Sequence, residues 1–228
     1  MVRSSNNRSL RVPSGPRRVR RRDARRAEIL RAASRIFRER GFADTGMREI
    51  ADSADLSPGN LYHYFRGKDE ILYYCQDRAL DRMLAAVTTA RRERRQPVER
   101  LTLILEAHLR TLLDDVEGAT AHLEVGALSP LLRARIVEKR DRYEAALRRL
   151  VTEGIARGEF VRVDPALITR AMLGALNWTV TWFRKDGPLP STAVAEILAA
   201  YLMRGLRATT SSDRKTLRPV DSGRTREP

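Results

Sequence analysis

The chain has 228 residues, of which 42% are hydrophobic, enough for one mid-sized core or for a small domain beside a larger one. Its single cysteine, Cys75, excludes an intramolecular disulfide, and no stretch reaches the roughly 20 uncharged apolar residues of a membrane span. A disulfide-stabilised or membrane-spanning protein is therefore excluded, and we expect a cytoplasmic protein.

Positive charge is concentrated at the start of the chain. The net charge is +15, and residues 1–22 alone carry eight Arg and no acidic residue, whereas residues 23–70 hold nine basic and nine acidic side chains. We expect residues 1–22 to form a basic arm that is disordered without DNA. Such an arm can neutralise phosphates or enter a minor groove, although a tail that serves only solubility has the same composition.

The first predicted helix begins at Asp23 or Ala24. Its apolar residues recur at helical spacing, and Gly41 stands where a C-terminal cap is expected. This helix opens a small domain that we expect to span residues 23–67.

The stretch Thr45–Lys68 predicts two short helices joined by a tight turn. Ser57 is a good N-cap for the second helix, expected over residues 58–64 with proline at its first position. Leu61 and Phe65, four residues apart, would hold this helix against a core and leave its polar and aromatic faces exposed. Such a pair is typical of a helix-turn-helix that reads the DNA major groove.

The remainder of the chain also predicts helices, with no strand-like alternation. We expect them over residues 68 to about 91–95, 98–116, 120–128, 130–157, 166–183 and 191–205. The predicted fold class is therefore all-α, with an N-terminal three-helix helix-turn-helix domain, a helical ligand-binding and dimerisation domain over residues 68–206, and a disordered tail over 207–228.

The helix predicted over residues 166–183 is apolar on nearly every face. A helix of this kind needs cover on two sides, and a partner subunit is the natural second cover. The alternative is that the excess apolar surface fills the core of a monomer.

The helix-turn-helix stretch resembles the signature of the TetR family of bacterial repressors. The residues that carry the resemblance are Phe42, Thr45, Ile50, Ala51, Ala54, Leu56, Ser57, Leu61, Tyr62, Tyr64, Phe65 and Lys68. One residue departs from the pattern, because Asp55 occupies the turn position that usually holds glycine. We expect a left-handed backbone there, which Asp tolerates better than most residues.

The resemblance implies which residues contact DNA. Thr45 would hold a phosphate, and Arg48 could add another phosphate contact. Three residues match family positions that grip the DNA backbone: Ser57, Tyr62 and Lys68. Four would face the groove: Pro58, Gly59, Asn60 and His63. The alternatives are a packing role for Tyr62, a capping role for His63 and a solvated helix start for Lys68.

The resemblance also implies a homodimer formed through the last two helices, about residues 166–184 and 191–205. A two-fold axis would present two reading helices to half-sites about 34–36 Å apart, so the double-stranded operator should be near-palindromic.

A further implication is a small-molecule effector bound in the C-terminal domain. The candidate ligand-binding residues are Met83, Leu105, His108, Leu112, His122, Tyr143, Asn177, Trp178, Trp182 and Arg184, although an apolar stripe is more often core than pocket. The stretch Gly174–Trp178 and its surroundings are similar to a TetR subgroup that controls fatty-acid, sterol or acyl-CoA breakdown. An acyl-CoA or other lipophilic effector follows, with phosphates held by Arg135, Arg140, Arg184 or Lys185.

Other classes of function fit the residues less well. The histidines and the cysteine show no spacing that assembles a catalytic site, and we find neither metal-ligand spacing nor a Gly-rich phosphate loop, so we expect no enzyme and no cofactor. A helical sensor or protein-interaction module without DNA binding, and a transcriptional activator of the same fold, remain as alternatives. We expect the protein at the nucleoid of a bacterial cytoplasm, while the operator and the effector stay open at this level.

Overall fold

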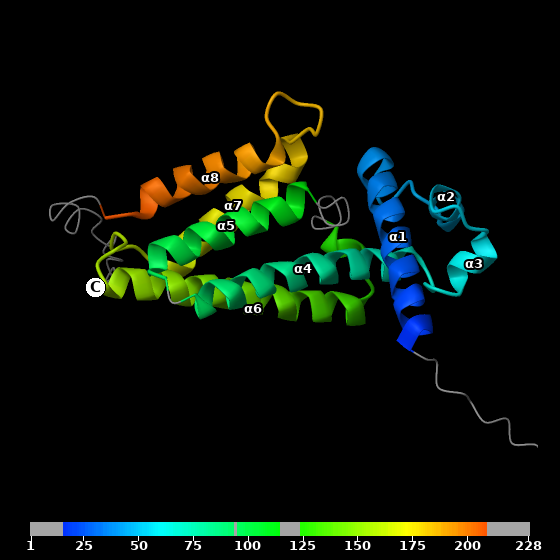
Figure 1. The fold of residues 1–228 in the computed structure, drawn as a ribbon, viewed down its shortest axis with the longest axis horizontal. Helices are drawn as coiled ribbons and strands as arrows, with labels where there is room; N and C mark the ends of the chain where they lie inside the picture. Colours follow the sequence, from blue (N-terminus) through cyan, green and yellow to red (C-terminus); the bar gives the residue numbers. More distant parts are fainter. Residues whose placement is uncertain (1–15, 94, 115–123, 209–228) are drawn as a thin grey trace, which may run out of the picture.

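The computed structural model describes residues 16–93, 95–114 and 124–208 and is built from helices throughout these ranges (Figure 1). Their bounds are α1 Pro16–Arg40, α2 Met47–Ser53, α3 Pro58–Tyr62, α4 Lys68–Arg92, α5 Pro97–Leu113, the 3₁₀ turn η2 Val125–Ala127, α6 Pro130–Ala156, α7 Pro165–Trp182 and α8 Ser191–Leu206. In these residues the nearest approach to a strand is an isolated antiparallel bridge between Phe160 and Arg207. The predicted all-α fold class is confirmed.

The first helix begins earlier than predicted. Residues 16–22 belong to α1, so the prediction that they lie in a disordered arm is wrong. The physical reason is that Pro16 suits the first turn of a helix and that the arginines after it are good helix formers. The predicted arm now reduces to residues 1–15, which lie outside the described residues, as does the tail from residue 209.

Local sequence signals place the other ends of the helices of the N-terminal domain. Gly41 follows α1 with a φ of +84° and Asp55 takes a φ of +52°, the left-handed conformation predicted for the turn. The Ser57 hydroxyl accepts the backbone N–H of Asn60 at 3.2 Å and so caps α3. This helix ends at Tyr62, two positions before the predicted Tyr64.

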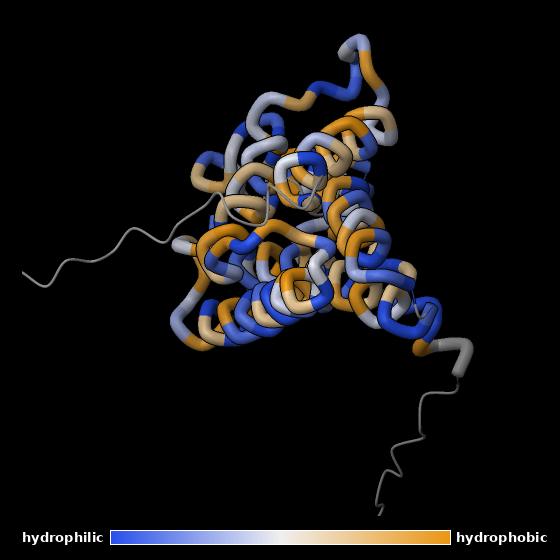
Figure 2. The backbone as a smooth tube through the Cα atoms, turned by 90° about the vertical axis from the view of Figure 1, so that its left-hand side faces the viewer, coloured by the Kyte–Doolittle hydropathy of each residue, from blue (hydrophilic) through white to orange (hydrophobic). Residues whose placement is uncertain are grey.

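The C-terminal domain is a bundle organised around α5. This helix packs against α4, α6, α7 and α8, and its inward side is fully buried at Leu101, Leu105 and Leu109. Viewed from the end away from the N-terminal domain, hydrophobic and hydrophilic segments alternate along the helices (Figure 2). Helix α4 belongs to this bundle and also contacts α1, so it joins the two domains.

Two predicted boundaries of this domain changed. The helix predicted over residues 120–128 is the short turn η2 where it is described, and residues 115–123 lie outside the described part. Helix α5 ends at Leu113 instead of residue 116. No helix in the described ranges combines the length and the hydropathy needed to cross a membrane.

Candidate DNA-binding surface and effector pocket

Helix α3 is held from behind and exposed in front. Leu61 and Phe65 are fully buried in the core of the N-terminal domain, and the Phe65 ring stacks edge-on against Tyr74 at 5.8 Å between centroids. The opposite face presents exposed residues: Ser57, Pro58, Gly59, Asn60, Tyr62 and His63. Because the core fixes the orientation of α3, these groups form a preformed surface.

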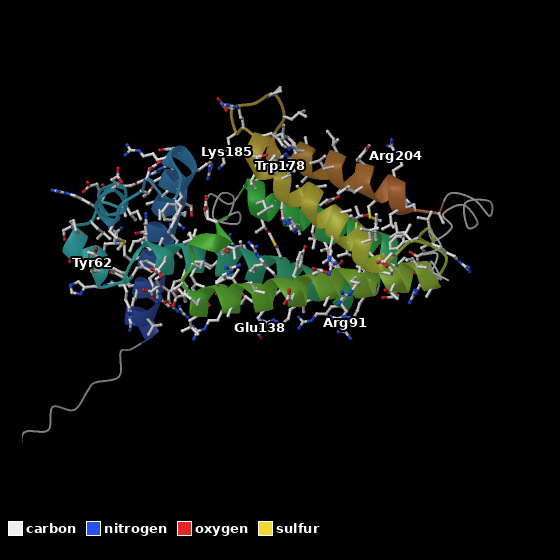
Figure 3. The ribbon with its side chains drawn as sticks, turned by 180° about the vertical axis from the view of Figure 1, so that it is seen from behind. Tyr62, Arg91, Glu138, Trp178, Lys185 and Arg204 are labelled. Atoms are coloured by element: carbon white, nitrogen blue, oxygen red, sulfur yellow. The ribbon has the colours of Figure 1, made fainter. Side chains whose placement is uncertain are left out.

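This surface lies at the end of the molecule away from the bundle. Tyr62 stands on the outer side of α3, with 55% of its surface exposed (Figure 3). A Cβ added at Gly59 would meet no atom within 4 Å, so the backbone is open to a close approach. An exposed helix with Asn, Tyr and His side chains and an accessible backbone has the groups that contact base edges and phosphates.

Two residues predicted to hold phosphates lie elsewhere. Thr45 is buried, and its hydroxyl donates to the carbonyl of Gly41 at 2.7 Å, so it braces a loop and does not face DNA. The Lys68 ammonium donates to the carbonyls of Phe42, Ala43 and Thr45, each at 3.0 Å. An ammonium group has three N–H donors, and these three carbonyls use all of them. Lys68 therefore connects the α1–α2 loop to α4, and in this arrangement no N–H of its ammonium is directed at a phosphate.

The start of α2 is built around Glu49. Its carboxylate accepts the backbone N–H of Gly46 at 2.7 Å and an N–H of Arg40 at 2.6 Å. The bond from the Gly46 N–H, followed by the charge of Arg40, lowers the pKa of Glu49. Arg48 beside it is exposed, as a phosphate contact requires.

A groove of about 690 Å³ separates the first turns of α1 from the end of α3. Arg21 and Arg22 line its α1 side, and His63 lines its α3 side. The guanidinium of Arg26 lies over the Tyr74 ring at 4.4 Å and the Phe65 ring at 4.9 Å, which fixes α1 against the reading helix. Arg21 and Arg22 therefore stand next to the exposed face of α3.

A second cavity, of about 270 Å³, lies within the C-terminal bundle. Its lining residues come from α4 to α7: Leu80, Met83, His108, Arg140, Tyr143, Glu144, Arg170, Leu173, Gly174 and Asn177. Four of these residues are apolar and six carry polar or charged groups, and a cavity on which polar groups converge beside apolar walls suits a small molecule.

A chain of three polar side chains crosses this pocket. His108 Nδ1 lies 3.1 Å from the Tyr143 hydroxyl, and His108 Nε2 lies 3.1 Å from Asn177 Oδ1. Burial lowers the pKa of His108 to about 4, and burial raises the pKa of Tyr143. The imidazole and the phenol are therefore neutral near pH 7, and the three groups join α5, α6 and α7 without a net charge.

Charged groups lie at the rim of the pocket. Arg170 on α7 pairs with Glu144 on α6, with 3.3 Å between Nε and Oε1. Arg140 is half-buried, and burial lowers the pKa of its guanidinium. Two arginines and one carboxylate give this rim an excess of positive charge.

The predicted ligand-binding residues divide into four groups. Met83, His108, Tyr143 and Asn177 line the pocket. Leu105 and Leu112 are core residues, and His122 lies outside the described residues. Trp178, Trp182 and Arg184 are exposed and absent from the pocket lining, because they project from the outer side of α7 and the loop after it.

The prediction missed Leu80, Glu144, Arg170, Leu173 and Gly174 as lining residues, and it named Arg140 only as a possible phosphate ligand. Leu173 and Gly174 precede Asn177 by one helical turn, so the i−3 and i−4 neighbours of Asn177 were the available signal.

An apolar surface is exposed on the last two helices. The exposed fractions are 64% for Trp178 and 50% for Trp182 on α7, and 56% for Ile197 and 70% for Tyr201 on α8. Each pair is four residues apart and so lies on one side of its helix. Trp178 is seen at the surface of α7 in Figure 3. Exposed aromatic surface of this kind marks sites of protein association.

These features define a class of protein: a helix-turn-helix DNA-binding regulator with a helical domain that holds a pocket. Residues 29–75 match the family described as "Bacterial regulatory proteins, tetR family", and residues 94–206 match "Tetracyclin repressor-like, C-terminal domain". The chain belongs to the TetR family of transcriptional regulators, as its sequence predicted.

Three relatives illustrate the match. The transcriptional repressor KstR2 of Mycolicibacterium smegmatis is 27% identical, over 80% of this chain and 91% of the relative. The TetR family regulator PfmR of Thermus thermophilus has a crystal structure that is 37% identical, with a TM-score of 0.71 over 79% of this chain and 99% of that chain. The crystal structure of AibR in complex with isovaleryl coenzyme A and operator DNA is 25% identical, with a TM-score of 0.67 over 78% of this chain and 98% of that chain.

The family membership settles the class of function. The protein is a DNA-binding transcriptional regulator and not an enzyme, and its relative KstR2 is a transcriptional repressor. Regulators of this family bind operator DNA, act as dimers and respond to small-molecule effectors. Among the described residues, no cluster of three His, Cys, Asp or Glu side chains is arranged to hold a metal ion.

Proposed function

We propose that the protein is a homodimeric repressor that reads a near-palindromic operator through α3 and leaves it when an acyl-coenzyme A type effector enters the pocket in the bundle. The observation that carries this proposal is the pairing of an exposed, rigidly held α3 with a pocket whose α4 wall joins the two domains. A repressor of this kind acts at the nucleoid, and we expect the protein in the cytoplasm.

The operator contacts that we propose come from two sets of residues. Pro58, Gly59, Asn60 and His63 enter the major groove, because they lie on the exposed face of α3. Phosphates are held by Arg48, Ser57 and Tyr62 beside the groove and by the arginines at the start of α1. The support is their exposure and their position around one helix.

The proposed dimer forms through the outer faces of α7 and α8. Large apolar side chains at 50–70% exposure on both helices support this interface. We expect Trp178→Glu to give a monomer that has lost most of its operator affinity, because two linked readers bind far more tightly than one. Leu131→Glu is the matched control, since Leu131 is 66% exposed but stands on α6. Light scattering after size exclusion reads out the mass, and a dimeric Trp178→Glu variant would contradict this interface.

The proposed effector class rests on the pocket and its rim. Apolar walls suit an acyl group, and the positive rim at Arg140 and Arg170 suits the phosphates of coenzyme A. The structure of AibR with isovaleryl coenzyme A and operator DNA supports a thioester as a ligand for this fold. An effector that prefers the conformation unable to bind the operator shifts the population away from DNA.

A gel-shift series tests the proposed function. The probe is the intergenic DNA upstream of the protein's own gene, with coenzyme A, several acyl-coenzyme A esters and the free acids as additions. We expect a shifted protein–DNA complex. Acyl-coenzyme A should dissociate this complex, and free coenzyme A should not. Release by unrelated lipophilic compounds alone would reject the effector class, and no shift at moderate salt would reject the operator reading.

A further inference from the structure

The polar cluster in the pocket keeps a hydrogen-bond donor for a ligand. In one arrangement Tyr143 donates to His108 Nδ1 and His108 Nε2–H donates to Asn177 Oδ1, so the Asn177 NH₂ group is not used by the imidazole. In the other tautomer, with the amide turned, one N–H of Asn177 donates to Nε2 and the second is still not used by it. Both arrangements therefore leave an N–H of Asn177 at the wall of the cavity.

A neutral acceptor suits this donor better than a carboxylate does. Burial lowers the pKa of His108 to about 4, so the imidazole supplies no positive charge to the pocket at pH 7. A carboxylate at Asn177 would lose its hydration beside a neutral imidazole, while the arginines stand at the rim, where they suit the phosphates of coenzyme A. The carbonyl oxygen of an ester or thioester accepts a hydrogen bond and carries no charge.

The size of the pocket limits the group that accompanies the carbonyl. Its volume of about 270 Å³ lies below the roughly 300–1,000 Å³ of common small-molecule sites. Leu80 and Met83 on α4 and Leu173 on α7 form apolar walls around it, and they are parts of helices packed on both sides. A compact acyl group fits this space, whereas a long chain or a ring system the size of a steroid requires the helices to separate.

We infer that the effector carries a compact acyl group whose carbonyl oxygen accepts a hydrogen bond from Asn177, and that the pocket discriminates against long-chain acyl groups, steroids and chains without a carbonyl. This inference rests on the proposed acyl-coenzyme A effector and adds the chemistry that selects among its members. Asn177 is the specificity-determining residue, and the rim arginines bind the part that all such thioesters share.

The experiment measures release of a fluorescent operator duplex, and binding by calorimetry, for the full-length protein. The ligands are isovaleryl-coenzyme A, palmitoyl-coenzyme A, coenzyme A alone and S-isopentyl-coenzyme A, in which a methylene replaces the carbonyl. We expect isovaleryl-coenzyme A to bind at least about tenfold more tightly than each of the others. In Asn177→Leu, which lacks the donors, the preference for the carbonyl over the methylene should disappear, whereas Leu131→Ala, at an exposed position of α6 that does not line the pocket, should keep it. Thermal unfolding of both variants verifies that they are folded.

The outcomes separate this inference from the proposed function. Equal binding of palmitoyl-coenzyme A, or an unchanged carbonyl preference in folded Asn177→Leu, would overturn the inference and leave the acyl-coenzyme A effector standing. Failure of every thioester to bind or to release the operator would overturn both.

Discussion

The DNA-binding surface and the pocket are built in opposite ways. On α3 the functional groups point outward, and the groups that hold the helix in place, Leu61 and Phe65, are separate residues on its other side. In the pocket, His108 and Tyr143 are buried, bind one another and also face the ligand site. Substitutions on the exposed face of α3 should therefore change operator affinity without changing stability. Substitutions in the pocket should change both effector affinity and stability.

The largest expected effect concerns the support of the reader. Phe65→Ala removes a buried ring that contacts Tyr74 and Arg26, and we expect a loss of about 3–5 kcal/mol in the free energy of unfolding of the N-terminal domain. Operator binding should vanish while effector binding by the bundle remains, as measured by gel shift and calorimetry. Loss of both activities together would show that the two regions are not separable.

The next effect concerns the pocket and pH. His108 has its pKa lowered to about 4 by burial, below the usual 6.5, so between these values the unfolded chain binds more protons than the folded one. The titration of His108 alone should therefore lower the free energy of unfolding by about 2–3 kcal/mol between pH 7 and pH 4.5. His108→Gln should flatten the loss in urea unfolding, and an equally steep loss in that variant would contradict the buried neutral imidazole.

An intermediate effect is expected at Lys68, which the sequence assigned to the DNA surface. Lys68→Ala leaves the carbonyls of Phe42, Ala43 and Thr45 without their shared donor, and we expect a cost of about 2 kcal/mol in stability. The variant should lose thermal stability in proportion to any loss of operator affinity. Weaker operator binding with an unchanged melting temperature would show that Lys68 contacts a phosphate directly.

A smaller effect is expected on the exposed face of α3. Tyr62→Ala should reduce operator affinity about tenfold, equivalent to about 1.4 kcal/mol, and leave the melting temperature and the dimer mass unchanged. Tyr62→Phe, which keeps the ring and removes the hydroxyl, separates a phosphate contact from ring packing. Wild-type operator affinity in Tyr62→Ala would show that Tyr62 does not contact DNA.

A last prediction concerns the salt dependence of binding and the role of the first helix in it. Replacing Arg21 and Arg22 by Ala preserves a good helix former and removes charge beside the groove next to His63. The slope of log affinity against log salt should become shallower by roughly 0.9 for each phosphate contact that is lost. If titrations between low and moderate salt give an unchanged slope, these arginines do not contact phosphates and serve only solubility.

The sequence predicted a region well where the residues that determine it are close together in the chain. The reader could be predicted because its cap at Ser57, its turn at Asp55 and its anchor at Phe65 lie within one short stretch and act on their near neighbours. The sequence did not predict that Thr45 and Lys68 donate hydrogen bonds to loop carbonyls, because spacing does not encode such contacts.

The pocket could be predicted only in part. Met83, His108, Tyr143 and Asn177 were named as ligand candidates on separate helices, but their meeting depends on how α4 to α7 pack around α5. Trp178 and Trp182 were assigned to the pocket because aromatic residues on an apolar helix have the same pattern on an inner face as on an outer one. The rotation of α7, set by tertiary packing, decides between the two.

Anisotropy titration of a labelled operator duplex, with and without isovaleryl-coenzyme A, tests the central claim most directly. The account predicts saturation at two protomers or a multiple of two per duplex, weakening at high salt, and a loss of affinity of at least about tenfold when the thioester is added. Saturation at a single protomer, or an affinity that no acyl-coenzyme A changes, would contradict it.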